Sequence, residues 1–227
     1  MLAVAGGKGG CGKTTTALGL GAALDGEVVV VDTDRDMPNL HSMAGVTREP
    51  TAADGTEPRR VNEGVSVLPA PPPTISDAEV TTVLSRVAAA TDARVVVDCP
   101  GGAGPDAAAP LSAVSEVVLV STACAPALRD TAKTAAMARA LGCRVHGVVL
   151  TRTSTTPRGV ESLLDCRVLG AIPNVAAPVL TDDRIRHAYA TVAERMASCG
   201  RRTGEQQSLY GGIRSDTGTA THMCDDV

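Results

Sequence analysis

Short runs of aliphatic residues, many of them rich in Val, alternate along the chain with longer segments of helical pattern. The runs are continuously apolar, which is typical of strands covered on both faces of a parallel sheet. They predict strands at residues 2–5, 28–32, 65–69, 95–98, 117–121, 145–151 and 168–172. Helices are predicted at residues 14–24, 77–90, 129–141 and 182–198, with Asp77 and Asp182 as N-caps. This alternation predicts an α/β fold with a doubly wound, mainly parallel sheet flanked by helices.

The segments between these elements indicate one domain followed by a tail. Residues 48–62 are polar and contain Pro and Gly, so we expect a surface loop there. Residues 70–74 hold three consecutive prolines and should form a stiff connector. After about residue 200 the apolar pattern stops, and the remaining residues are rich in Gly, Thr, Ser and Asp. We therefore expect a domain over residues 1–200 and a disordered tail over residues 201–227.

Composition narrows the classes of function. The 227 residues include two Tyr and neither Trp nor Phe, which argues against binding single-stranded nucleic acid through stacked aromatic side chains. The net charge of −4 argues against a general polyanion binder. The seven cysteines are at least 19 residues apart, which excludes a CxxC metal or redox pair. With neither a signal-peptide pattern nor a membrane-spanning run in the sequence, we expect a cytoplasmic protein with free thiols.

A glycine-rich loop lies between the first predicted strand and the first predicted helix. It fits the phosphate-binding pattern GxxxxGK[ST] with the residues Gly7-Lys8-Gly9-Gly10-Cys11-Gly12-Lys13-Thr14. Glycines let successive backbone N–H groups approach phosphate oxygens, and the following helix adds its positive end. We expect Lys13 to bridge the β- and γ-phosphates, Thr14 to bind Mg²⁺ and Thr15 to donate to the α-phosphate. ATP and Mg²⁺ are therefore the expected ligands.

Lys8 places a second lysine inside this loop, although the chain has only three lysines against eighteen arginines. A bias of this kind toward arginine is typical of halophilic or GC-rich genomes. The segment KGGxGKT, with the extra lysine, resembles the deviant Walker A motif of the MinD/ParA family of P-loop ATPases. The resemblance implies that Lys8 reaches across an ATP-bridged homodimer to the phosphates of the partner subunit, in the manner of an arginine finger.

Residues 32–40, which follow the second predicted strand, fit the family's switch I pattern DxDxxxxNL. A plain strand end with solvated acids is the alternative interpretation, and it suits Asp36 best. The resemblance assigns Asp34 to positioning the attacking water beside the metal, with Asp32 and Asn39 supporting the site. It thus implies three catalytic residues, namely Lys8, Lys13 and Asp34.

Residues 98–102 fit the family's switch II pattern DxPxG, and the resemblance places Asp98 behind the direct ligands of Mg²⁺. Two later positions resemble the family less specifically. Arg152 follows a strand where related ATPases carry residues beside the adenine, and Pro173 belongs to a GxIP-like segment that closes over the base. A plain exit from strand to loop is the alternative at both. Residues 121–130 resemble the loop that leads into the family's dimer-face helix.

The resulting hypothesis is a slow, Mg²⁺-dependent ATPase whose ATP-driven homodimerisation positions or regulates a partner in cell division, partitioning or spatial organisation. A protein activator or cargo is expected. The alternatives are a non-hydrolysing, ATP-gated scaffold for a motility, chemotaxis or surface complex, and a metabolic P-loop ligase. Residues 203–227 show no basic amphipathic stripe, so we expect no autonomous membrane anchor. DNA binding is open but disfavoured by net charge, although the last predicted helix and its continuation carry Arg184, Arg186, Arg195, Arg201 and Arg202.

Overall fold

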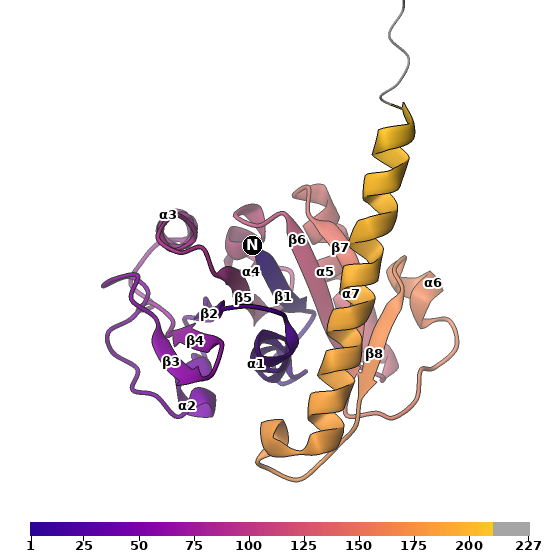
Figure 1. The fold of residues 1–227 in the computed structure, drawn as a ribbon, viewed down its shortest axis with the longest axis horizontal. Helices are drawn as coiled ribbons and strands as arrows, with labels where there is room; N and C mark the ends of the chain where they lie inside the picture. The colour runs from indigo at the N-terminus through magenta and orange to yellow at the C-terminus, as the bar shows by residue number, and fades with distance from the viewer. Residues whose placement is uncertain (211–227) are drawn as a thin grey trace, which may run out of the picture.

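A central sheet separates two layers of helices in the computed structural model, which describes residues 1–210, with side chains as far as Ser198 (Figure 1). The sheet has the strand order β3-β4-β2-β5-β1-β6-β7-β8. In the described chain every neighbouring pair is parallel except the edge pair β3/β4. The strands are β1 (Leu2–Gly6), β2 (Val28–Asp32), β3 (Arg59–Asn62), β4 (Val65–Leu68), β5 (Arg94–Gly101), β6 (Glu116–Thr122), β7 (Arg144–Thr151) and β8 (Val168–Ile172).

Each face of the sheet carries its own apolar core under its own helices. The helices are α1 (Lys13–Ala23), α2 (Leu40–Ala44), α3 (Asp77–Ala89), α4 (Pro105–Ser112), α5 (Ala125–Ala140), α6 (Val160–Leu164), the 3-10 helix η1 (Val179–Thr181) and α7 (Asp183–Tyr210). Val29 and Val31 of β2 belong to the core cluster that α3, α4, α5 and α6 cover, whereas Val28 and Val30 belong to the cluster under α1, α2 and α7. This arrangement confirms the predicted doubly wound α/β fold.

The structure corrects several short elements and one cap. Strand β3 lies inside the segment predicted to be a surface loop. This strand pairs only with β4 and is partly exposed and mostly polar, so it lacks the apolar run that predicts a buried strand. Helices α2, α4 and α6, with five to eight residues each, are too short for a helical period to show. Asp77 is the first residue of α3, whereas Ser76 is its N-cap in a capping box with Glu79. Asp182 does accept a hydrogen bond from the amide of Arg184, at 2.9 Å, as an N-cap does.

Helix α7 continues past its predicted end at residue 198 and reaches Tyr210. Residues 201–210, which the sequence assigned to the tail, are therefore helical, and residues 211–227 of that tail lie outside the described residues. Figure 1 shows the C-terminal part of α7 extending beyond the sheet. Within the described part of the chain, no helix is both long and apolar enough to cross a membrane.

Helices α1 and α7 contact each other through a glycine and a tyrosine. The ring of buried Tyr189 occupies the place that a side chain on Gly19 would need, since an added Cβ would be 2.3 Å from ring carbons. The Tyr189 hydroxyl lies 3.2 Å from Thr16 Oγ1, so two buried polar groups satisfy each other. Burial raises the pKa of Tyr189 to about 12. The tyrosine therefore stays neutral and anchors α7 onto the helix that begins at the glycine-rich loop.

Replacing Gly19 with Ala should destabilise the protein, because the new methyl group would overlap the Tyr189 ring. We expect the free energy of unfolding to fall by about 1–3 kcal/mol, the usual cost of overpacking a core, in urea titrations. Gly21→Ala is the matched control in the same helix, since its Cβ would be 3.1 Å from a Val30 methyl, a much milder contact than 2.3 Å. The better helix propensity of Ala, about 1 kcal/mol, should offset that contact. Equal losses in the two variants would contradict the prediction.

Candidate functional site

The three predicted motifs meet at the carboxyl edge of the sheet. Strands β2, β5 and β1 are consecutive, so the loops that leave them are neighbours. Asp32 is paired in register with Asp98, and Gly6 with Gly101. The structure thus brings together the P-loop (residues 6–15), switch I (residues 32–40) and switch II (residues 98–102).

Glycines give the P-loop its shape. Gly10 and Gly12 have φ angles of 73° and 94°, in the left-handed region that favours glycine. Gly7 lies against the backbone of α5, where an added Cβ would be 2.2 Å from the carbonyl carbon of Asp130. The loop is consequently held between β1 and α5 with its backbone free of side chains, as a phosphate cradle requires.

The two lysines of the P-loop have different surroundings. Lys13 opens α1, is 6% exposed, and its Nζ donates to the carbonyl of Lys8 at 3.4 Å. Lys8 itself is exposed. Thr14 and Thr15 are half-buried in the first turn of α1, where backbone N–H groups lack helical partners. Cys11 is buried and burial raises the pKa of its thiol, so this residue can meet a ligand only through its backbone.

Switch II packs directly onto the P-loop. An added Cβ on Gly101 would be 2.8 Å from the amide nitrogen of Gly9 and 3.2 Å from Lys13 Nζ. The amide of Gly102 donates to the carbonyl of Gly6 at 2.9 Å. The sequence pattern DxPxG leaves position 101 open, so it missed the residue with the closest backbone contact. Two adjacent glycines carry no local signal that distinguishes their roles.

Two acids are buried where the switches meet. Asp32 and Asp98 are 0% and 1% exposed. Burial raises the pKa of both carboxyls, and the charge of Asp32 raises the pKa of Asp98 further. The Asp32 carboxylate accepts hydrogen bonds from the amides of Asp34, at 2.9 Å, and Leu40, at 3.2 Å. Asp98 Oδ1 has no hydrogen-bond partner among the described residues.

The residues around Asp98 fit a magnesium site in which phosphate oxygens supply some of the ligands. The Thr14 hydroxyl and the charge of Lys13 both counteract the rise in the pKa of Asp98, so these groups lie close together. The described residues include no group of three or more His, Cys, Asp or Glu that could hold a metal. In phosphate sites Mg²⁺ typically takes one or two protein oxygens, substrate phosphates and waters. Thr14 and Asp98 are suited to that mode of binding.

Switch I places Asp34 beside the buried acids. Asp34 is half-buried, its charge contributes to the raised pKa of both Asp32 and Asp98, and its Oδ1 accepts a hydrogen bond from the amide of Met37 at 3.0 Å. Asn39, predicted to support the site, is exposed and occupies the N-cap of α2 without a side-chain capping bond. Switch I therefore brings Asp34 to the site, and the Asn39 backbone counteracts the rise in the pKa of Asp32.

A protein-family model described as the CobQ/CobB/MinD/ParA nucleotide binding domain matches residues 2–191. The chain belongs to this family. It is 26% identical, over 194 residues, to an uncharacterized ATP-binding protein of Methanocaldococcus jannaschii, covering 76% of this chain and 73% of that protein. The family resemblance expected from the motifs is confirmed.

Solved structures of MinD proteins share the fold. The cell division ATPase MinD of Pyrococcus furiosus matches with a TM-score of 0.76 and 23% identity, over 87% of this chain and 98% of that one. The septum site-determining protein MinD of Pyrococcus horikoshii, complexed with Mg-ADP, matches with a TM-score of 0.74 and 22% identity, over 93% and 98% of the chains. These likenesses confirm a P-loop fold of the MinD type.

In this member of the MinD/ParA family, the two residues predicted to lie beside the adenine base are at the ends of β7 and β8. Arg152 has a left-handed φ of 56°, and its guanidinium donates to the Gly10 carbonyl at 2.8 Å. Thr151, which the sequence analysis did not select, donates from its hydroxyl to the Cys11 carbonyl at 2.7 Å. Pro173 follows β8 and is partly buried. Arg152 and Thr151 thus fix the P-loop from a strand about 140 residues away along the chain.

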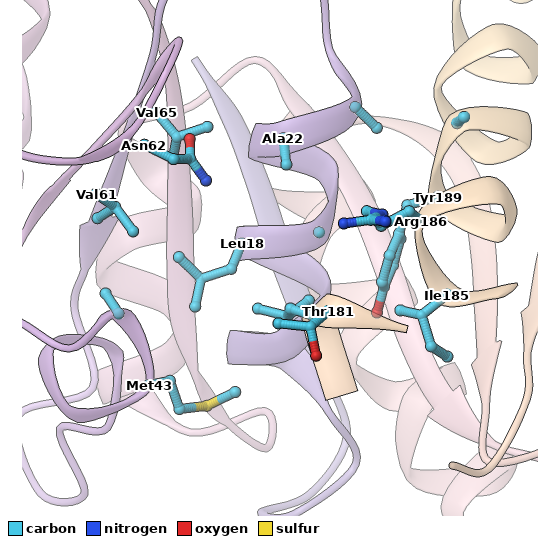
Figure 2. A pocket seen from close by; sticks show the side chains of 15 residues that line it. Leu18, Ala22, Met43, Val61, Asn62, Val65, Thr181, Ile185, Arg186 and Tyr189 are labelled. Atoms are coloured by element: carbon cyan, nitrogen blue, oxygen red, sulfur yellow. The ribbon is translucent and has the colours of Figure 1, made fainter. Parts of the chain in front are cut away.

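A separate cavity of about 400 Å³ lies among α1, α2, the β3/β4 edge, η1 and α7. Figure 2 shows Leu18, Met43, Ile185 and Tyr189 among the side chains that line it. Its only charged lining residue is Arg186, which pairs with Asp183. It shares no residue with the P-loop or the switches, and most of its lining side chains are apolar. The phosphate-binding motifs of the sequence therefore lie in the loop cluster and not in this cavity.

Replacing Thr151 with Val should weaken nucleotide binding by loosening the P-loop. The change keeps the shape of the side chain but leaves the Cys11 carbonyl without this donor. We expect a loss of about 1 kcal/mol in the free energy of unfolding and roughly tenfold weaker Mg-ADP binding in calorimetry. Thr191→Val is the control, because Thr191 is half-buried and its solvent-exposed hydroxyl bond goes only to a carbonyl of its own helix, at His187. Unchanged ADP affinity in Thr151→Val would contradict this role.

Proposed function

We propose that the protein is a Mg²⁺-dependent ATPase of the MinD/ParA type, in which ATP binding drives homodimerisation and hydrolysis restores the monomer. The contrast between the two P-loop lysines carries the proposal: Lys13 is buried against its own loop, whereas Lys8 is exposed. A buried lysine serves the phosphates of its own subunit, and an exposed one is available to those of a second subunit. The Mg-ADP complex of the similar MinD from Pyrococcus horikoshii supports the choice of ligand.

Catalysis in such a site is mainly positioning and electrostatic stabilisation. The P-loop N–H groups and the Lys13 ammonium hold the β- and γ-phosphates. Mg²⁺, when bound, neutralises charge on the phosphate oxygens. The Thr14 hydroxyl supplies an oxygen ligand to the ion, and the Asp98 carboxylate orients the water around it. The half-buried Asp34 carboxylate accepts a hydrogen bond from the attacking water and aims it at the γ-phosphate.

The cycle needs a second protein to become fast. Carboxylates are weak bases at neutral pH, so a site that relies on a carboxylate to activate water turns over slowly. An activator that contacts the switches would raise the rate, and the ATP-bound homodimer would present a composite surface to an activator or cargo. Dimer formation through Lys8 thus couples the state of the nucleotide to the choice of partner.

Hydrolysis is tested by phosphate release from purified protein with Mg-ATP. We expect slow turnover that EDTA abolishes. Asp34→Ala should lower kcat by about 100-fold or more, the usual contribution of a positioned base, and should leave Mg-ADP affinity within about twofold. Undiminished turnover in this variant would contradict the role of Asp34. ATP-dependent dimerisation without turnover in the natural protein would indicate the ATP-gated scaffold instead.

Dimerisation is tested by sedimentation in the Asp34→Ala background, which should retain ATP. We expect a dimer with Mg-ATP and a monomer with Mg-ADP. Adding Lys8→Ala should leave a monomer with either nucleotide, because the ammonium that reaches the partner's phosphates is lost. Arg60→Ala is the control, since it removes an exposed positive charge that pairs with Glu27 on the edge of the sheet. A Lys8→Ala variant that dimerises normally would refute the proposed bridge.

A further inference from the structure

Arg35 joins switch I to the start of α3. Its guanidinium donates to the carbonyl of Ile75 and to the carboxylate of Asp77. The Arg35 side chain is only 15% exposed, the lowest value for any Arg or Lys that forms an ion pair in the described part of the chain. The Asp77 side chain is 42% exposed, so the pair is shielded from solvent on the Arg35 side. These contacts are made by the residue that directly follows Asp34 in the chain.

The anchor on α3 is itself firmly placed. The connector of residues 70–74, with its three prolines, leaves β4 at the same edge of the sheet as switch I leaves β2, because β4 and β2 are neighbours. The amide of Ser76 donates to Glu79 Oε2 at 2.6 Å in the capping box, and α3 buries Val80 and Leu84 in the core. The atoms that receive the Arg35 guanidinium therefore keep their positions independently of switch I.

The rest of switch I has no comparable anchor. The amide of Asp34 donates to Asp32 and the amide of Met37 donates to Asp34, so both bonds stay within the loop. Among the described residues, the bonds of Arg35 are the only hydrogen bonds that join residues 34–38 to the chain outside residues 32–40. Met37 is 67% exposed and adds no packing. The conformation of this loop consequently depends on Arg35.

We propose that Arg35 is a positioning residue for hydrolysis: by fastening switch I to α3, it keeps the Asp34 carboxylate beside the buried acids and the P-loop. Both hydrogen bonds of Arg35 go to the 75–77 segment, so the role assigned to it is to hold the loop and not to bind phosphate. This inference rests on the proposed ATPase function. The pattern DxDxxxxNL leaves position 35 open, so the role comes from the contact and not from the motif.

The test compares Arg35→Ala, Arg35→Lys and Asp77→Asn with the control Arg60→Ala, whose ion pair with Glu27 is exposed on both sides. Hydrogen exchange of the amides of residues 34–37 reports on the loop directly, in the absence of turnover. We expect exchange at least tenfold faster in Arg35→Ala, with α3 amides unchanged. With Mg-ATP, kcat should fall about tenfold, equivalent to ~1.4 kcal/mol, while KM and Mg-ADP affinity stay within twofold.

Arg35→Lys should recover part of kcat, because an ammonium can reach one of the two acceptors, and Asp77→Asn should give an intermediate loss. The double variant of Arg35→Ala and Asp77→Asn should be no worse than Arg35→Ala alone. Unchanged amide exchange of residues 34–37 in Arg35→Ala would overturn the inference whatever the activity. Faster exchange with an unchanged kcat would also overturn it. If Arg35→Ala exchanges faster but the natural protein does not hydrolyse ATP, the ATPase function is refuted and, with it, the positioning role.

Discussion

The backbone of switch II approaches the backbone of the P-loop so closely that no side chain fits between them. Gly101 faces the amide of Gly9 and the ammonium of Lys13, and the amide of Gly102 bonds to the carbonyl of Gly6. This contact requires glycine, and it fixes two loops that lie about 95 residues apart in the sequence. The strand order β2-β5-β1 makes the contact possible, because it places all three motif-bearing strands side by side.

The same contact buries the acids on which the chemistry depends. Asp32 and Asp98 are paired across β2 and β5 with almost no exposure to solvent. Burial of a carboxylate is costly unless it is bonded or neutralised, and it raises the pKa of each group here. Lys13 and the Thr14 hydroxyl act against that cost, and in the proposed cycle Mg²⁺ adds to their effect. The burial of these two acids therefore costs electrostatic free energy, which a cationic ligand would lower.

Segments distant in the sequence support this arrangement from both sides of the sheet. Tyr189 of α7 packs on Gly19 and contacts Thr16, which keeps α1 in place behind the P-loop. Thr151 at the end of β7 holds the Cys11 carbonyl. On the other face, the start of α3 holds Arg35 of switch I. Each layer of helices thus secures one part of the loop cluster.

The sequence by itself determined the fold class, the family and the three motifs. Strands such as β2 and β8 end where their apolar runs end, and the P-loop pattern is local, so continuous apolar runs and motif spacing are enough to find them. Strand β3 is not predicted, because an exposed edge strand has little apolar signal. The predicted cap at Asp77 is wrong by one residue, although the capping box of Ser76 and Glu79 is a local signal.

Only the tertiary structure decided how the motifs are held. The partners of Arg35 and Thr151 lie about 40 and 140 residues away, and no periodicity in the sequence relates residues at such separations. The buried state of Lys13 and the exposed state of Lys8 likewise follow from the closure of switch II over the P-loop. Local patterns specify which residues can bind phosphate, whereas the packing of distant loops specifies where those residues point. The physical reason is that side-chain contacts across a sheet depend on strand order, which the order of residues along the chain does not express.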